Sequence, residues 1–307
     1  MRQAANLRVG ERVPLIMVLL AFLVALAGCT TTALPQPPPP IQNERYAAIV
    51  VDASDGRVLY QVHADQRRFP ASLTKMMTVL MLFDALDQGR IAKSTPIPVS
   101  EYARARPPTK IGFARGGTID VDTAIRALVI RSANDVASAV GELLAGSEDR
   151  FGEMMTARAR ELGLRDTVFR NASGLPDPGQ VTTARDMAVL ALVLRRNYPH
   201  HYHYFANRSF TYAGREIRGH NELLGRVAGV DGLKTGFIRA SGYNLATSAM
   251  RGGRSVVAVV MGGETAASRN AHMERLIEEF LPMANVGTPA AARPPMAARQ
   301  PMAPVGG

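Results

Sequence analysis

A serine and a lysine three residues apart, Ser72 and Lys75, form the first pair in the chain whose types and spacing could do chemistry. They stand at the start of a helical pattern over residues 72–87, in which apolar residues share one stripe. Residues i and i+3 lie on one face of a helix, so the hydroxyl and the amine can meet. A serine needs an adjacent base to become a nucleophile. Taken alone, this pair is weak evidence for a catalytic site, because a chain of this length is expected to contain about one serine followed three residues later by lysine by chance.

A second polar group, Ser132 and Asn134, interrupts an apolar helical pattern. Residues 121–130 and 136–144 on either side predict two helices. The two polar side chains could cap the second helix, since serine and asparagine favour that position. Alternatively, Ser132 supplies a second hydroxyl that relays protons, and the Asn134 amide binds a peptide group of a substrate.

The third group, Lys234, Thr235 and Gly236, lies in a strand pattern over residues 230–237. It could be an edge strand that ends at a glycine. Alternatively, the lysine and threonine bind an anionic end of a substrate, and the glycine lets the ligand approach the backbone. By chance, a particular three-residue sequence such as Lys-Thr-Gly is expected well below once in a chain of this length, so this group is the more specific signal.

The remaining pattern indicates the elements that position these groups. Two short strands with Asp55 and Gly56 between them predict a hairpin. A block of helices follows, then three strands and a last helix; the expected elements cover residues 46–51, 57–62, 72–87, 121–130, 136–144, 151–162, 184–194, 230–237, 243–250, 255–262 and 266–281. This order lacks the regular alternation of a parallel sheet. It predicts a mixed α+β fold, with an antiparallel sheet of about five strands covered by helices.

Residues 1–28 predict a secretory signal peptide. Arginines precede an uncharged apolar run over residues 15–27, which is too short for a comfortable membrane span. The run ends at Cys29, the only cysteine, in a sequence that resembles the lipobox of bacterial lipoproteins. The resemblance implies that Cys29 is lipidated and becomes the new N-terminus. An ordinary cleavage site over residues 25–27 is the alternative.

The segments on either side of the patterned region predict where the folded domain begins and ends. Residues 29–44 are a Pro-rich linker, which should be extended. Residues 284–307 are rich in proline and alanine and predict a disordered tail, which leaves residues 45–283 as one compact domain. The net charge is +10, but the basic residues are scattered and show no aromatic-basic module. We therefore expect a solvated surface and no nucleic-acid partner.

Together the three groups resemble the active-site trio of penicillin-binding proteins and class A β-lactamases, in the same order. The resemblance to the low-molecular-mass serine D-alanyl-D-alanine carboxypeptidases, of β-lactamase/transpeptidase-like fold, covers roughly residues 45–265. It is carried by residues 70–78, 132–135, 171–175, 183–188, 230–237 and 241–244. Two departures stand out. Thr156 follows Met155 where the family commonly has asparagine, and the chain ends before the β-rich second domain and the membrane-binding helix of several members.

The resemblance implies a role for each group. Ser72 is the nucleophile, Lys75 the neutral base, and Ser132 the residue that passes a proton to the leaving amine. The substrate-binding residues are expected to be Asn134, Lys234, Thr235, Gly236 and Phe237. The backbone N–H groups of Ser72 and Phe237 would form an oxyanion hole. No metal or organic cofactor is needed.

The implied function is that of a serine D-Ala-D-Ala carboxypeptidase acting on peptidoglycan stem peptides, with β-lactams as covalent inhibitors. We expect residues 45–283 to be its catalytic domain, exported and lipid-anchored on the periplasmic face of a bacterial membrane. Three alternatives remain: a D,D-endopeptidase, a class A-like β-lactamase, and an inactive wall-binding lipoprotein. The β-lactamase needs a water-activating glutamate. No glutamate between the second and third groups has an asparagine four residues on, the pattern expected of that enzyme.

Overall fold

The computed structural model describes residues 43–287, and a five-stranded antiparallel sheet is the largest element in them. Its strand order is β2-β1-β9-β8-β7. The strands are β1 (Ala47–Asp52), β2 (Val58–Val62), β7 (Val230–Ile238), β8 (Gly242–Arg251) and β9 (Arg254–Gly263). The first and last strands of the chain pair with each other, with Ala47 opposite Met261. The predicted hairpin and the three predicted C-terminal strands thus form one sheet, which confirms the expected mixed fold.

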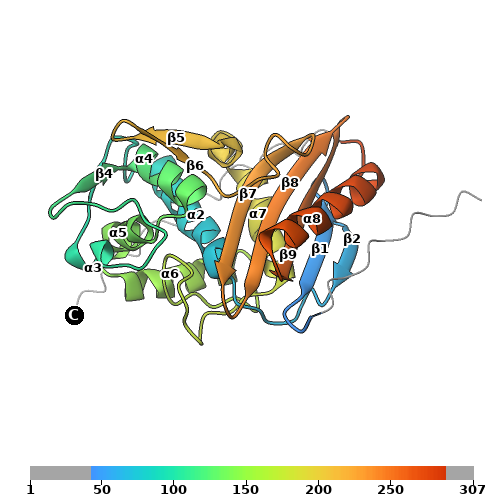
Figure 1. Ribbon diagram of the computed structural model, residues 1–307, viewed down its shortest axis with the longest axis horizontal. Coiled ribbons are helices and arrows are strands. Elements are labelled where there is room, and N and C mark those ends of the chain that lie inside the picture. Colours follow the sequence, from blue (N-terminus) through green and yellow to red (C-terminus); the bar gives the residue numbers. More distant parts are fainter. Residues whose placement is uncertain (1–42, 288–307) are drawn as a thin grey trace, which may run out of the picture. The chain divides into compact units, whose positions relative to one another are not determined.

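Both faces of this sheet are covered. Every residue of β1 is buried, and successive side chains of a strand point to opposite faces. Ile49 accordingly joins one hydrophobic cluster and Val50 the other. Helix α8 (Ala266–Phe280) packs on one face, and α7 (Ala184–Asn197) packs on the other (Figure 1).

The helical region is built around α2 (Lys75–Asp87), which is buried almost all round. A helix that is apolar on every side belongs in a core. It packs against other helices of this region, which comprises α3 (Glu101–Arg104), α4 (Val121–Arg126), α5 (Asn134–Ala145) and α6 (Glu148–Glu161) (Figure 1). The residues at its start are therefore held by a rigid element.

The described chain also contains two small two-stranded sheets and several tight turns. One sheet pairs β3 (Pro96–Pro98) with β4 (Thr118–Asp120), which helix α3 separates in the sequence, and the other is the hairpin of β5 (Ser209–Tyr212) with β6 (Arg215–Arg218). The turns are the 3₁₀ segments Ala71–Thr74, Tyr202–Ala206 and Leu281–Met283, and the π-helical turn Ala127–Arg131. Neither small sheet was predicted, because their strands have only three or four residues and lack a sustained alternating pattern.

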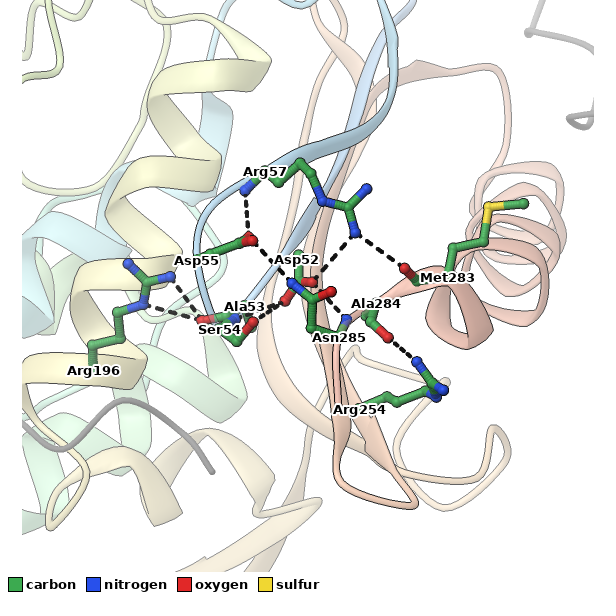
Figure 2. Close-up of polar contacts among 10 residues, drawn as sticks. All are labelled: Asp52, Ala53, Ser54, Asp55, Arg57, Arg196, Arg254, Met283, Ala284 and Asn285. Atoms are coloured by element: carbon green, nitrogen blue, oxygen red, sulfur yellow. Dashed lines mark hydrogen bonds and ion pairs between the residues drawn. The ribbon is translucent and has the colours of Figure 1, made fainter. Parts of the chain in front are cut away.

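The C-terminal boundary of the folded region differs from the sequence prediction. Residues 284–287, which we expected in the disordered tail, pack beside the β1–β2 turn (Figure 2). The buried Asp52 carboxylate accepts a hydrogen bond from the Asn285 N–H at 2.7 Å, and Arg254 donates to the Ala284 carbonyl. These backbone groups have partners supplied by the sheet, which composition alone does not reveal. The folded region therefore continues at least to Gly287.

The predictions about the chain ends fall largely outside the described residues. The signal peptide over residues 1–28, Cys29, most of the linker and the tail beyond residue 287 are not described. Among the helices of residues 43–287, none combines the length and apolar character needed to cross a membrane.

Candidate active site

Ser72 lies in the 3₁₀ turn Ala71–Thr74, immediately before α2, and not within the helix as predicted. A 3₁₀ turn brings residues i and i+3 onto the same side even more closely than an α-helix does. The Lys75 Nζ atom accordingly lies 3.2 Å from the Ser72 Oγ atom. The predicted meeting of hydroxyl and amine is present in the structure.

The Lys75 amine is fully buried. Its Nζ atom also donates hydrogen bonds to Asn134 Oδ1 at 2.7 Å and to the Ser173 carbonyl at 2.6 Å. Burial lowers the Lys75 pKa well below its ordinary value, and the positive charge of Lys234 lowers it further, against the opposing effect of nearby carboxylates. A neutral amine has two N–H donors and one lone pair. In that form both donors would go to the two carbonyl oxygens, which would leave the lone pair for the Ser72 hydroxyl proton, whereas a charged amine donates to Ser72 Oγ as well.

The second polar group lies where α4 gives way to α5. The chain passes through the π-helical turn Ala127–Arg131, and Ser132 then adopts a left-handed conformation (φ 62°, ψ 38°). Such turns and such strained residues are common at functional sites. The N-cap of α5 is Ala133, and no side chain caps that helix. The capping interpretation of this polar group is therefore wrong.

Ser132 and Asn134 differ in how their polar atoms are used. The Ser132 Oγ atom is buried and has no hydrogen-bond partner within residues 43–287, and its relay of protons stays a prediction. Asn134 is occupied at both ends, because Oδ1 accepts from Lys75 and Nδ2 donates to the Pro107 carbonyl at 2.9 Å. In this structure Asn134 positions the lysine. Its contact with a substrate stays a prediction.

The third group occupies β7, at an edge of the sheet. This strand continues past Gly236 to Ile238, so it does not end at the glycine. A methyl group at Gly236 would lie 3.0 Å from the Ser72 nitrogen and 3.2 Å from the Pro70 carbonyl oxygen. The glycine thus lets the turn that carries Ser72 approach the strand, a physical reason different from the ligand approach that we inferred from the sequence.

Lys234 and Phe237, on the same strand, differ in how far they are buried. Lys234 is buried, and its Nζ atom donates to the Thr235 carbonyl at 2.9 Å. Phe237 is 52% exposed, and its ring packs against Tyr243 with a centroid separation of 4.3 Å. The strand therefore carries a buried cation and an exposed aromatic ring three residues apart.

Asn244, on β8, fixes the approach of the Ser72 turn to the sheet. Its Nδ2 atom donates to the carbonyls of Phe69 and Pro70 at 3.0 and 3.1 Å, and its Oδ1 atom accepts from the Gly262 N–H. Sequence analysis noted this position only as part of a family-like segment. Its role depends on contacts across 174 residues of chain, which local patterns cannot show.

The loop over residues 171–175 supplies the Ser173 carbonyl to Lys75. It packs so closely on the Ser72 turn that a methyl group at Gly174, whose φ is +85°, would lie 1.8 Å from the Ala71 carbonyl oxygen. The buried Glu148 carboxylate accepts from the Ala172 N–H at 3.0 Å and so fixes the loop. The loop is thus part of the machinery that holds the amine.

Arg269, on α8, adds a cation that sequence analysis did not single out. It is buried and donates to the Asn244 carbonyl at 2.9 Å. Burial, together with the Arg269 charge, lowers the Lys234 pKa to about 7. Among the described residues, no carboxylate forms a salt bridge with Lys234. The arrangement is suited to an incoming anion, which would stabilise the charged form of the lysine.

A family model described as D-alanyl-D-alanine carboxypeptidase matches residues 31–265, well over half of the chain. The chain belongs to the D-alanyl-D-alanine carboxypeptidase family. Among the relatives of this family, the carboxypeptidase DacA of Escherichia coli is 35% identical over 78% of this chain and 60% of its own length. The carboxypeptidase DacF of Bacillus subtilis is 33% identical over 78% of this chain and 62% of its own length. The chain thus spans about three fifths of the length of these curated relatives.

Solved structures of family members and related proteins share the fold. Penicillin-binding protein 5 of Haemophilus influenzae aligns with a TM-score of 0.75 and 31% identity, over 80% of this chain and 72% of that protein. Penicillin-binding protein D2 of Listeria monocytogenes, solved in its ampicillin-bound form, aligns with a TM-score of 0.67 and 32% identity, over 76% of this chain and 96% of that one. The chemical roles of the individual residues here stay predictions.

Binding of a carboxylate at Lys234 should weaken as the pH rises. The lowered pKa leaves Lys234 charged below about pH 7 and neutral above it, so affinity should fall by up to about tenfold per pH unit above that point. We would measure the dissociation constant of an acylated D-alanyl-D-alanine peptide by calorimetry from pH 6 to 9, with Ser72→Ala protein to prevent turnover.

Lys234→Arg is the matched variant, because a guanidinium keeps its charge over this range. It should flatten the pH profile even if absolute affinity changes. The same fall in affinity in both proteins would assign the pH dependence to another group.

Proposed function

We propose that this chain is a serine D-Ala-D-Ala carboxypeptidase, which removes the terminal D-alanine from peptidoglycan stem pentapeptides through an acyl-enzyme. The observation that carries the proposal is the buried Lys75 amine 3.2 Å from the Ser72 hydroxyl, held by hydrogen bonds to Asn134 and the Ser173 carbonyl. The curated relatives named as D-alanyl-D-alanine carboxypeptidases support the same reaction.

Acylation begins when the Ser72 oxygen attacks the carbonyl carbon of the penultimate D-alanine, as its proton passes to the neutral Lys75 amine. The backbone N–H groups of Ser72 and Phe237 stabilise the oxyanion. Ser132 donates its hydroxyl proton to the departing nitrogen of the terminal D-alanine and takes up the proton that Lys75 accepted from Ser72, so that Lys75 is neutral again as the peptide bond breaks. Water then hydrolyses the Ser72 ester and releases the shortened stem peptide.

Recognition of the substrate rests on its free C-terminus. Lys234 and Thr235 bind the terminal carboxylate, and the buried Arg269 adds positive potential behind them. Asn134 donates to a peptide carbonyl with the amide hydrogen that Pro107 does not use. No step of this scheme requires a metal ion or an organic cofactor.

β-Lactams fit the same site as covalent inhibitors, because their ring carbonyl stands where the peptide carbonyl would and their carboxylate stands for the C-terminus. Penicillin-binding protein D2 of Listeria monocytogenes has been solved in ampicillin-bound and cefotaxime-bound forms, and it is 32% and 30% identical to this chain in the two comparisons. A β-lactam acyl-enzyme should be long-lived here, since no water-activating glutamate is evident in the sequence.

A D,D-endopeptidase activity is the second candidate. A D-alanyl-D-alanine endopeptidase of Pseudomonas aeruginosa is 28% identical over 75% of this chain and 76% of its own length. Both reactions use the same nucleophile and base, so they differ in the group that leaves: a single D-alanine or a cross-linked stem.

The location that we propose is the periplasmic face of a bacterial membrane, reached by export and held by a lipid on Cys29. It rests on the sequence: a basic start, a short apolar run and a lipobox-like ending at the only cysteine. A diacylglyceryl group supplies two buried chains, which is the number that stable anchoring generally needs. The Pro-rich linker would hold the catalytic domain off the surface.

The reaction is tested with a stem pentapeptide and a cross-linked stem dimer in parallel. We expect free D-alanine from the pentapeptide at a much higher rate, and a single penicillin adduct by intact-mass spectrometry, absent in Ser72→Ala. Faster cleavage of the dimer would favour the endopeptidase. Rapid, repeated turnover of a chromogenic cephalosporin would favour the β-lactamase. A protein that acts on none of these would be a wall-binding protein without catalysis.

Anchoring is tested with Cys29→Ala in cells given a palmitate label. The wild type should fractionate with membranes and carry the label, whereas Cys29→Ala should be released or remain unprocessed. The substitution should leave the catalytic activity unchanged, because Cys29 lies outside the expected catalytic domain over residues 45–283. Membrane-bound wild type without label, or soluble wild type, would instead favour ordinary cleavage after residue 27.

A further inference from the structure

Three side chains of metal-ligand type converge at a place outside the active site. Asp87 is the last residue of α2, and His200 and His201 lie between α7 and the 3₁₀ turn Tyr202–Ala206. The Nε2 atoms of His200 and His201 lie 2.9 and 2.8 Å from one oxygen of Asp87. All three candidate ligand atoms fall within 4.8 Å of one another.

This geometry is close to what a small metal ion requires. Ligands bound about 2.0–2.2 Å from a tetrahedral ion are separated from each other by about 3.3–3.6 Å. The two nitrogen–oxygen distances are about 0.4 to 0.8 Å shorter, as hydrogen bonds are, so the side chains would have to move apart to admit an ion. A small outward movement of the exposed His200 would open the site, since that side chain is 54% exposed.

We propose that Asp87, His200 and His201 together bind one Zn²⁺ ion, with water in the fourth position. Two imidazole nitrogens and one carboxylate oxygen form a set that borderline metals favour. Ca²⁺ and Mg²⁺ prefer sites made wholly of oxygen ligands. None of its three residues belongs to the trio of Ser72, Lys75 and Lys234, and the proposal does not rest on the proposed reaction.

His201 is held in place for this task. Its ring is buried and stacks on Phe83 with a centroid separation of 4.6 Å. The stacked ring thus presents Nε2 to the site as a fixed ligand.

The ion would join two parts of the chain that serve the active site. It would connect the C-terminal end of α2, whose first residue is Lys75, to the segment that continues into the turn Tyr202–Ala206. Phe205 of that turn packs against Gly232 of β7, the strand that carries Lys234. With one cysteine the chain can form no internal disulfide, and a structural ion at this place would act as a cross-link.

The test uses the full-length chain, purified without a histidine tag and treated with a chelator. Calorimetric titration with Zn²⁺ should give one ion per chain, and Zn²⁺ should raise the thermal unfolding midpoint whereas Mg²⁺ should not. Asp87→Asn and His200→Gln should each weaken Zn²⁺ binding by roughly 100-fold or more, because loss of a mere supporting partner already costs 10- to 100-fold.

His203→Gln is the matched control, since His203 is exposed, lies in the same segment and is not part of the cluster. It should bind Zn²⁺ as the wild type does, and circular dichroism should show all variants folded. Absence of Zn²⁺ binding in the folded wild type would overturn the proposal. An equal loss of affinity in His203→Gln would also overturn it, because it would show unspecific binding by a histidine-rich segment. Neither result depends on peptidase activity.

Discussion

The proposed reaction depends on one constraint: the buried amine of Lys75 must lose its proton beside Ser72, although the Glu148 and Asp135 carboxylates favour its charged form. An exposed lysine is protonated at neutral pH and cannot accept a proton. In this chain, burial and the second cation at Lys234 both disfavour the charged form. The two carbonyl oxygens of Asn134 and Ser173 accept hydrogen bonds from the amine and fix its position, so in the proposed neutral form its lone pair would face Ser72.

Much of the surrounding structure can be understood as support for that buried amine. Helix α2 begins at Lys75 and is surrounded by other elements, so its first turn has little freedom to move. The Ser72 turn is held from the sheet by Asn244 and lies against the edge strand at Gly236, which has no side chain to keep it away. We expect that replacing either contact would shift Ser72 relative to Lys75, the proposed nucleophile and base, and small displacements of reacting groups slow a reaction strongly.

The sequence predicted the parts that follow from local periodicity and failed where distant segments decide the outcome. The strands of the main sheet, the buried helices and the meeting of Ser72 with Lys75 could be predicted from spacing alone. That Ser72 lies in a 3₁₀ turn, and that Gly236 serves the approach of that turn, depends on contacts between β7 and residues far away in the chain. Arg269 looked like any helix arginine, and nothing in its neighbourhood in the sequence indicates that it is buried near Lys234.

Contacts between distant segments also explain why the sequence did not predict the C-terminal boundary or the cluster of Asp87, His200 and His201. Composition placed residues 284–287 in a disordered tail, but Asp52 and Arg254 supply their backbone with partners. Asp87 is separated by 113 residues from His200, so only the fold brings them together. A high content of proline and alanine indicates only that a segment tends to be disordered. It does not show whether a neighbouring sheet offers hydrogen-bond partners to its backbone.

The protonation state of Lys75 tests the account most directly, and the chain is suited to the measurement because it contains only four lysines. Protein labelled with ¹³C at lysine Cε gives few resonances, and a Lys75→Met variant assigns the one of interest. We predict that the Lys75 signal has the shift of an uncharged amine at pH 7 in the free protein. A charged ammonium at pH 7, losing its proton only near the ordinary value of 10.5, would contradict the account.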